Sequence, residues 1–314
     1  MKPIDRHIFG PVPSRRLGLS LGIDLVPPKT CTYDCIYCQV GKTTKKTIEC
    51  REFFPVHDIL EELKNRLSSV TPDVLTFSGS GEPTLYSKID ELIYGIRRLT
   101  NKKITLLTNG SLLWKDDVME RILDVDIIMP TITTQFEDTF NIIHKPHPEL
   151  TISKVTEGLI RLRQEFRGKI YLELFVLAGI NDNEKELLAL KEIVGKIFPD
   201  KIQINTVVRP PSDKRALAVD IQRLKEIKDL FGDRAEIIAD RSTHISDTVQ
   251  EDKIEHILGM IKRRPVRDID IANALGIDVD EVQSIIKGLL IKGMVLKYDH
   301  LGETYYKGRV RYEE

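Results

Sequence analysis

Short apolar runs alternate with amphipathic stretches from about residue 20 to residue 240. The runs are rich in Val, Ile, Leu and Phe, which is typical of strands buried on both faces. They predict strands at 19–26, 74–78, 104–108, 127–132, 170–177, 202–207 and 236–239. Between them, apolar residues recur at helical spacing, most clearly in 57–70 and 184–198. This alternation predicts an α/β fold with a parallel sheet covered by helices. In such sheets ligands bind beyond the carboxyl ends of the strands.

The pattern changes near residue 250. Three helices are predicted at 252–262, 268–275 and 279–292, and two short strands at 294–298 and 303–306 flank a turn. Three helices followed by a β-hairpin resemble a winged helix-turn-helix. We therefore predict a core domain at 1–245 and a small winged-helix domain at 250–314, with the boundary at about 242–251.

Composition places the chain among globular proteins, since 41% of its 314 residues are hydrophobic and 30% are charged. The net charge of −1 gives no general attraction to nucleic acid. No apolar run approaches the ~20 residues that span a bilayer, and the first ten residues lack the apolar stretch of a signal peptide. We expect a soluble, cytoplasmic protein with no membrane partner.

Three of the four cysteines, Cys31, Cys35 and Cys38, fall within eight residues at the spacing C-x3-C-x2-C. In a reducing compartment such a group favours metal binding or redox chemistry over disulfides. Iron–sulfur clusters usually take four thiolates, so three would leave one iron open to another ligand. A zinc site with Cys50 as fourth ligand is the alternative. Structural zinc sites normally have a distant second pair of ligands, which Cys50 alone does not supply.

The cysteine spacing, with Tyr37 directly before the last cysteine, resembles the signature of the radical S-adenosylmethionine (SAM) superfamily. The resemblance implies a partial (β/α)6 barrel in which the three cysteines hold a [4Fe-4S] cluster. It also implies that the open iron binds the amino and carboxylate groups of SAM. A separate one-electron donor reduces the cluster. One electron from the reduced cluster then cleaves SAM to methionine and a 5′-deoxyadenosyl radical, which abstracts hydrogen from a substrate.

Gly79, Gly81, Glu82 and Pro83 belong to a Gly-Ser-Gly-Glu-Pro segment after the second predicted strand. Alone, a glycine-rich turn with one acid is usually only a turn. Here it resembles the GGEP element of the superfamily. The resemblance implies that the backbone approaches the methionyl ammonium of SAM and that Glu82 offsets its charge.

Further SAM contacts are expected from Tyr37, Asn109, Thr131 and Thr133. Tyr37 resembles an aromatic residue that lies beside the adenine, although a core aromatic that supports the loop is the alternative. Asn109 ends the third predicted strand and either lines the site or makes the turn. Thr131 and Thr133 stand where relatives have a Ser-Leu-Asp-Ala-like segment. Their hydroxyls can keep hydrogen bonds, but the carboxylate that would meet the ribose is replaced by Thr133.

Four segments, 10–18, 141–148, 179–182 and 203–211, narrow the resemblance to the group related to the tRNA wyosine-base synthases. Wyosine synthases carry a second cluster and a lysine that binds pyruvate. This chain has only Cys50 left over, too few for a second cluster, and we expect Cys50 to be an ordinary thiol. Membership of the group therefore implies shared cluster chemistry rather than wyosine synthesis.

Six residues of these segments are candidates to face the substrate: Arg15, Arg16, His144, Lys145, His147 and Arg209. Four are cations, which suits an anionic substrate such as a nucleotide or a carboxylate. Ion pairing at the barrel rim is the alternative for each. The two histidines are weaker candidates as metal ligands, because neighbouring prolines hold their segment extended.

The predicted third C-terminal helix opens with Asp278, Asp280 and Glu281, whose charge opposes the binding of duplex DNA phosphates. We therefore expect the winged helix to dock a protein or an RNA. The sequence as a whole predicts a radical SAM enzyme acting on an unidentified substrate, with tRNA and protein as candidates. The alternative is an iron–sulfur or SAM-sensing transcription regulator that acts through the winged helix.

Overall fold

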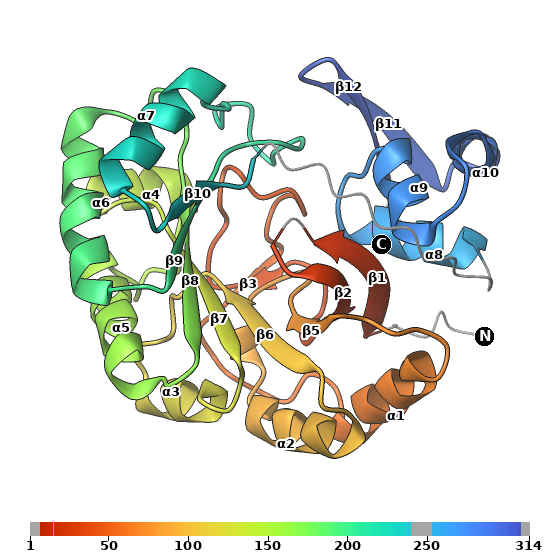
Figure 1. Ribbon diagram of the computed structural model, residues 1–314, viewed down its shortest axis with the longest axis horizontal. Coiled ribbons are helices and arrows are strands. Elements are labelled where there is room, and N and C mark those ends of the chain that lie inside the picture. Colours follow the sequence, from red (N-terminus) through yellow and green to blue (C-terminus); the bar gives the residue numbers. More distant parts are fainter. Residues whose placement is uncertain (1–6, 15, 240–252, 309–314) are drawn as a thin grey trace.

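The computed structural model describes residues 7–14, 16–239 and 253–308 (Figure 1). Eight strands form one sheet in the order β1-β2-β5-β6-β7-β8-β9-β10. Their bounds are β1 Ile8–Ser14, β2 Gly18–Ile23, β5 Val74–Phe77, β6 Lys103–Thr108, β7 Ile127–Ile132, β8 Lys169–Phe175, β9 Lys201–Asn205 and β10 Ala235–Ile237. All neighbours from β2 to β10 are parallel, so their carboxyl ends lie at one edge of the sheet. The predicted helix-covered parallel sheet is confirmed.

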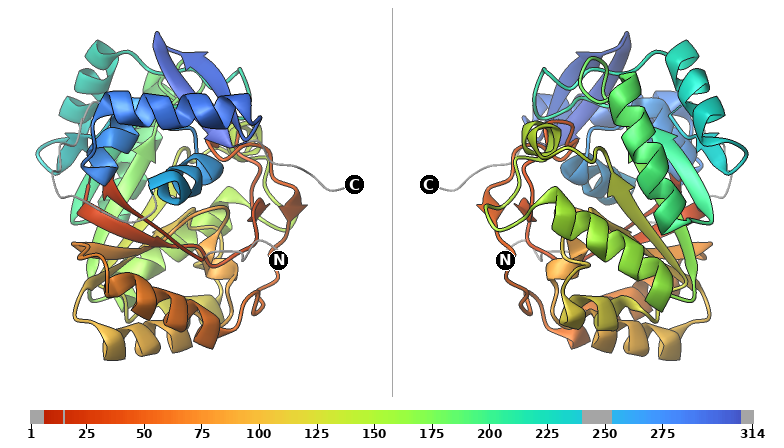
Figure 2. Two further views of the ribbon diagram at one scale, coloured as in Figure 1. Left: turned by 90° about the vertical axis from the view of Figure 1, so that its right-hand side faces the viewer. Right: turned by 90° about the vertical axis from the view of Figure 1, so that its left-hand side faces the viewer.

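Helices follow the strands and lie along the outside of the curved sheet (Figures 1 and 2). They are α1 Val56–Leu67, α2 Ile89–Leu99, α3 Asp116–Ile122, α4 Glu137–His144, α5 Ile152–Glu165, α6 Glu184–Ile197 and α7 Ile221–Phe231. Each buries one apolar stripe: α2, for example, buries Ile89, Leu92, Ile93 and Ile96, which share one helical face. Burial of these stripes against the sheet forms the main core.

Strand β1 was not predicted. It pairs antiparallel with β2 and forms the edge of the sheet. Pro11 and Pro13 interrupt its hydrophobic pattern, and prolines are tolerated in sheets mainly on edge strands because they donate no ladder hydrogen bond. Two further short strands, β3 Thr30–Cys31 and β4 Lys45–Lys46, pair with each other outside the main sheet.

The C-terminal unit contains α8 Lys253–Arg263, α9 Asp268–Leu275, α10 Val279–Ile291 and a hairpin of β11 Val295–His300 and β12 Glu303–Gly308. It has its own apolar core, against which Val12 of β1 packs. The Tyr305 hydroxyl donates to the Val208 carbonyl at 2.8 Å, so the unit also contacts the loop after β9. Figures 1 and 2 show it beside β1. The predicted domain boundary at 242–251 lies outside the described residues.

Among the helices that the structure describes, none combines the length and apolar character needed to cross a membrane.

Candidate functional site

The three clustered cysteines lie on one tightly folded segment that follows β2. Cys31 ends β3, and the Cys38 N–H donates to the Cys35 carbonyl at 3.1 Å. Farther along, Thr43 closes the segment on itself: its N–H donates to the Asp34 carboxylate at 2.7 Å and its hydroxyl to a backbone carbonyl at 2.7 Å. The thiols are therefore carried on a backbone whose shape is fixed by local hydrogen bonds.

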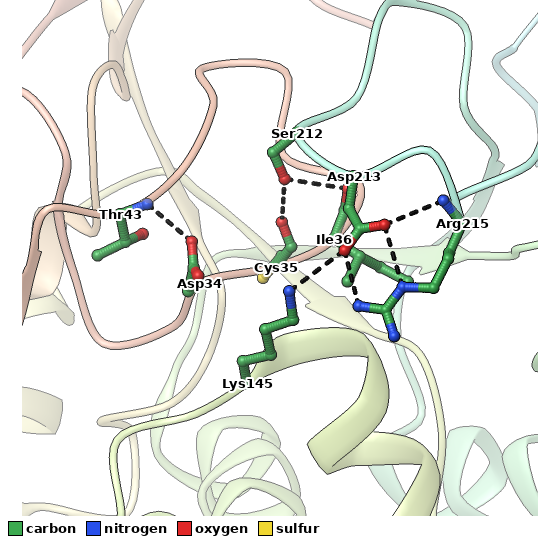
Figure 3. Close-up of polar contacts among 8 residues, drawn as sticks. All are labelled: Asp34, Cys35, Ile36, Thr43, Lys145, Ser212, Asp213 and Arg215. Atoms are coloured by element: carbon green, nitrogen blue, oxygen red, sulfur yellow. Dashed lines mark hydrogen bonds and ion pairs between the residues drawn. The ribbon is translucent and has the colours of Figure 1, made fainter.

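The loop after β9 clamps this segment from one side (Figure 3). The Ser212 hydroxyl donates to the Cys35 carbonyl at 2.8 Å. The Asp213 carboxylate accepts from Arg215 at 2.7 Å and from Lys145 at 3.3 Å. Hydrogen bonds from the side chain and backbone of Arg215, with help from Lys145, hold the pKa of Asp213 well below its usual range. Lys145 is thus paired with an acid beside the cysteine segment.

The end of α4 supports the same segment from behind. The Asp34 N–H donates to the His144 carbonyl at 2.8 Å, and the His147 N–H donates to the Thr32 carbonyl at 2.9 Å. The Lys145 residue between them has a left-handed backbone, with φ of 42°, which turns the chain at the helix end. Segment 144–147 therefore acts as a wall of the cysteine loop.

The His144 ring is buried between the loop and β7. Its Nδ1 lies 3.1 Å from Cys35 Sγ, and its Nε2 lies 2.8 Å from Thr133 Oγ1. Burial lowers the pKa of His144 to about 3, so the ring is neutral and carries one N–H. An Nδ1–H that donates to sulfur leaves Nε2 to accept the Thr133 hydroxyl proton. Thr133 is itself buried.

The glycines after β5 allow that turn to lie directly against the residues that precede the cysteines. A Cβ added to Gly81 would lie 1.8 Å from the Thr30 carbonyl oxygen. Gly79 has φ of +146°, and a Cβ there would lie 2.3 Å from the Asp24 carboxyl carbon. The Ser80 hydroxyl donates to that carboxylate at 2.6 Å. Both glycines are required by close approach of the two loops.

Glu82 is a buried connector between the turns after β5 and β6. Its carboxylate accepts from the Thr84 N–H at 3.1 Å, the Thr84 hydroxyl at 2.7 Å, the Thr108 hydroxyl at 2.6 Å and the Asn109 N–H at 2.8 Å. Burial raises the pKa of Glu82, and these four donors partly offset that effect. Pro83 follows as the first residue of a short 3₁₀ helix, η1 Pro83–Leu85.

Asn109 carries this network to the first cysteine. Its side-chain amide donates to the Thr32 hydroxyl at 2.8 Å and lies 3.6 Å from Cys31 Sγ. Burial, followed by the nearby Glu82 carboxylate, raises the pKa of Cys31 to about 12. Burial also raises the pKa of Cys35, with contributions from the thiols of Cys31 and Cys38. The three sulfurs are thus close enough to act on one another.

These thiols fit an iron–sulfur cluster. Burial disfavours the thiolate forms of Cys31 and Cys35 in the free chain, and bound iron supplies the positive charge that removes this penalty. Within residues 7–14, 16–239 and 253–308, no three Cys, His, Asp or Glu side chains converge on a single metal ion. A four-iron cluster imposes a different demand, because each cysteine binds its own iron atom.

A second group of polar side chains, which the sequence analysis did not predict, is centred on Glu173 of β8. Arg16 is ion-paired with it, the Thr131 hydroxyl donates to it at 2.8 Å, and the Asn205 amide donates at 3.0 Å. Burial would raise the pKa of Glu173, but Arg16 and the neutral donors lower it overall. A charged residue inside the otherwise apolar run 170–177 was the signal that could have found it.

Tyr37 belongs to the cysteine loop and packs against β8. Its ring stacks on Phe175 with centroids 4.1 Å apart, and it meets the edge of His144 at 5.9 Å. It belongs to a small apolar cluster behind the loop. One face of the ring is therefore occupied by Phe175.

The remaining candidates lie at different places. Arg209 points toward Gln39, with 3.4 Å between Nη1 and Oε1, and is partly buried beside the C-terminal unit. Cys50 stands apart from the other cysteines and donates to the Thr84 carbonyl at 3.5 Å. Arg15 lies outside the described residues.

The fold and the site define the class: an α/β protein with a parallel sheet and a three-cysteine site at the carboxyl edge. The cysteines lie on the loop after the first parallel strand, and the turns after β5, β6 and β9 surround them. The Radical SAM superfamily model matches residues 25–190, which include all three cysteines and the Gly-Ser-Gly-Glu-Pro segment. The chain belongs to the radical SAM superfamily.

Two curated relatives extend the match beyond these residues. Identity to a UPF0026 protein of Methanocaldococcus jannaschii is 33% over 320 residues, covering 96% of each chain. Identity to GTPase Obg of Brachyspira hyodysenteriae is 36% over 297 residues, covering 92% of this chain. The chain spans only 43% of that second relative's length. The name GTPase applies to that relative.

This chain does not contain the complete phosphate-binding pattern G-x4-G-K-[ST] of many GTPases at Gly41. Ile36 occupies the position of the first glycine in that pattern.

Solved structures share the fold at low sequence identity. TYW1 with a bound lysine–pyruvate adduct has a TM-score of 0.53 at 18% identity, covering 71% of this chain and 75% of TYW1. A radical SAM methyltransferase from Sphaerobacter thermophilus has a TM-score of 0.53 at 14% identity, covering 69% and 65%. SuiB of Streptococcus suis bound to SAM has a TM-score of 0.50 at 15% identity, covering 66% and 46%. These similarities show a common fold.

Proposed function

We propose that the protein is an enzyme that holds a [4Fe-4S] cluster on Cys31, Cys35 and Cys38 and uses it to cleave SAM reductively. When bound, the cluster and SAM supply a 5′-deoxyadenosyl radical that abstracts hydrogen from a substrate. The observation that carries this proposal is the hydrogen-bonded chain from Glu82 through Asn109 to Cys31, which joins the cysteine loop to the Gly-Ser-Gly-Glu-Pro turn.

The chain's own residues make this corner rigid. Ser212 and Asn109 contact the cysteine segment from two loops and His144 contacts it from the end of α4, so the segment is held in place before any cofactor binds. Gly79 and Gly81 let the backbone of the turn after β5 pack directly against Asp24 and Thr30, next to the cysteine loop. We assign the methionyl end of SAM to this backbone. Glu82, whose carboxylate already accepts four hydrogen bonds, positions the turn and places a negative charge nearby.

We assign Tyr37, Asn109 and Thr131 to the rim of the SAM site and Pro83 to the turn that supports it. Tyr37 lies between Cys35 and Cys38 in the chain, and the Thr131 hydroxyl donates to Glu173 at 2.8 Å. Thr133 has a different role in this proposal. Its hydroxyl is buried on His144, so it orients that ring instead of meeting the ribose.

We also propose that the enzyme belongs to the group related to the wyosine-base synthases. The segments that resemble that group, 141–148 and 203–211, both approach the cysteine loop, which supports a shared arrangement around the cluster. The substrate is left open by this argument, with tRNA and protein as candidates.

Residues 250–314 are proposed to form a winged-helix domain after a core at 1–245. The order of three helices and a hairpin supports this assignment. Asp278, Asp280 and Glu281 at the start of α10 favour a docked substrate over duplex DNA. The transcription-regulator alternative is not favoured, because the neighbouring folds are those of radical SAM enzymes.

The test is SAM cleavage by anaerobically reconstituted protein. After reduction with dithionite and addition of SAM, 5′-deoxyadenosine formed per cluster is measured in the parent, in Cys35→Ala and in Cys50→Ala. We expect product from the parent and from Cys50→Ala, which lacks only the thiol outside the cluster, and none from Cys35→Ala. Failure of the parent to take up iron, or equal product from Cys35→Ala, would contradict the proposal.

A further inference from the structure

A groove of about 690 Å³ lies beside the cysteine segment, between residues 41–44 and the C-terminal unit. The core contributes Lys29, Lys42 and Thr43 to its lining, and the C-terminal unit contributes Tyr298 and Lys307. The loop at 210–212, which clamps the cysteine segment, forms part of the lining. The groove therefore needs both the core and the C-terminal unit to exist.

Its lining is cationic and rich in hydroxyl groups. Of the residues that line it, Lys29, Lys42 and Lys307 are cations, four carry hydroxyls, and none is Asp or Glu. Asp34, an acid that acts electrostatically on Lys29, is already engaged by the Thr43 N–H at 2.7 Å. Electrostatic complementarity therefore favours an anionic occupant.

Two of the ammonium groups are brought together in an unfavourable way. Lys29 Nζ donates to the Val40 carbonyl, and Lys307 Nζ lies 3.3 Å from the same oxygen. A Cβ added to Gly41 would lie 2.5 Å from Lys29 Nζ and 3.3 Å from Lys307 Nζ. Two ammonium groups held this close repel each other. An anion that accepts from both would relieve this repulsion.

We propose that this groove binds the phosphate group of a phosphorylated substrate. Several ammonium and hydroxyl donors around one space match the multiple acceptor oxygens and charge of a phosphate monoester. Tyr298, which is 40% exposed, offers an aromatic face for an organic group attached to that phosphate. This inference rests on the proposed function in one respect, because it takes the bound phosphate compound to be the substrate of the enzyme. Binding in the groove itself requires neither SAM nor a reduced cluster.

The experiment is calorimetric titration of full-length, anaerobically reconstituted protein without SAM or dithionite. The probes are inorganic phosphate, uridine 5′-monophosphate and uridine; a uracil nucleotide avoids competition with an adenine site. We expect the monophosphate to bind and uridine to bind at least tenfold more weakly. Equal affinity for inorganic phosphate and the monophosphate would mean that the groove binds free phosphate. Tighter binding of the monophosphate would mean that it binds a phosphorylated organic substrate.

Variants decide whether the groove is the site. Lys307→Met keeps the aliphatic stem of a half-buried side chain, and Lys42→Glu reverses an exposed charge that has no role in the core. Each should weaken phosphate binding about ten- to hundredfold, the effect of one charge-assisted hydrogen bond. Lys297→Met, on the same hairpin but outside the groove, should leave affinity unchanged.

The inference would be overturned if neither phosphate probe bound the parent protein. It would also be overturned if Lys307→Met and Lys42→Glu bound phosphate as tightly as the parent and Lys297→Met. A parent protein that binds phosphate but forms no 5′-deoxyadenosine would refute the proposed enzyme while leaving this site in place, so the two failures are distinguishable.

Discussion

His144 Nδ1 lies 3.1 Å from Cys35 Sγ, although 109 residues separate the two in the chain. Thr133 fixes the other ring nitrogen at 2.8 Å, and burial keeps the ring neutral. The imidazole therefore cannot turn away from the sulfur without breaking a buried hydrogen bond. His144 is a positioning residue for the proposed cluster.

Replacing His144 should change the reduction potential of the reconstituted protein. A hydrogen bond to a cluster sulfur stabilises the more negative reduced state. His144→Phe should lower the midpoint potential by about 20–60 mV, the equivalent of one net hydrogen bond for a one-electron couple. The measurement is a redox titration followed by electron paramagnetic resonance.

Two comparisons make this result specific. His144→Gln, which keeps an amide N–H, should recover part of the shift, and His57→Phe on the exposed face of α1 should show none. An unchanged potential in His144→Phe at full iron content would show that the imidazole does not act on the cluster.

Gly81→Ala should push the turn after β5 away from the start of the cysteine loop. The new methyl group would meet the Thr30 carbonyl oxygen at 1.8 Å, so the backbone next to Cys31 must move. We expect a loss of about 1–3 kcal/mol in the free energy of unfolding and lower iron uptake per chain. Gly195→Ala is the control, because nothing lies within 4 Å of a Cβ there and α6 should gain about 0.5–1 kcal/mol. Equal urea midpoints and equal iron content in Gly81→Ala and the parent would contradict the steric argument.

The strands of the sheet were predictable because each is a short apolar run between polar turns. β7 has the predicted bounds, and β5, β6 and β8 differ from prediction by one or two residues at their ends. Edge strand β1 was not predicted, because its prolines interrupt the hydrophobic pattern that burial imposes on an inner strand. Local sequence therefore reported burial well and strand pairing poorly.

The site was only partly predictable for a similar reason. The cysteines and Gly81 follow from spacing within a few residues. The roles of Asp24, Glu173 and His144 depend on contacts across 56, 157 and 109 residues, respectively. Such contacts depend on which loops the sheet brings together, and the local sequence pattern does not specify which loops become neighbours.

Asp200 should make stability depend on pH in the acid range. Its carboxylate accepts from Lys169 at 2.8 Å, from the Ile170 N–H at 2.9 Å and from Arg163 at 3.2 Å. Burial alone would raise the pKa of Asp200, but these donors lower it overall. The stabilisation is therefore complete above the pKa of an unfolded aspartate, about 3.9, and is lost as pH falls through the lower folded value.

Asp200→Asn should cost about 1 kcal/mol between pH 5 and 8, since water screens a partly exposed charge. The difference from the parent should shrink below about pH 4. Urea titrations of the cluster-free protein across this range measure it, with Asp229→Asn on the exposed face of α7 as control. A difference that stays constant down to pH 3 would mean that the charge of Asp200 contributes nothing.

Arg16 and Glu173 should show strong energetic coupling. Both side chains are 13% exposed, so their ion pair is largely shielded from water. Arg16→Met leaves a buried carboxylate without its cation, which typically costs about 3–5 kcal/mol. Thr131 and Asn205 still donate to that carboxylate, so we expect the lower end of this range. The free energy of unfolding in urea gives the value.

The double variant Arg16→Met, Glu173→Gln separates charge from packing. Removing the carboxylate's charge eliminates the penalty that the first substitution exposes, so the double variant should be more stable than Arg16→Met alone by at least about 1 kcal/mol. The exposed pair Arg223 and Glu226 on α7 provides the comparison, with coupling below about 1 kcal/mol. If the effects of Arg16→Met and Glu173→Gln simply add, the ion pair contributes no coupling, and Glu173 is held by its neutral donors alone.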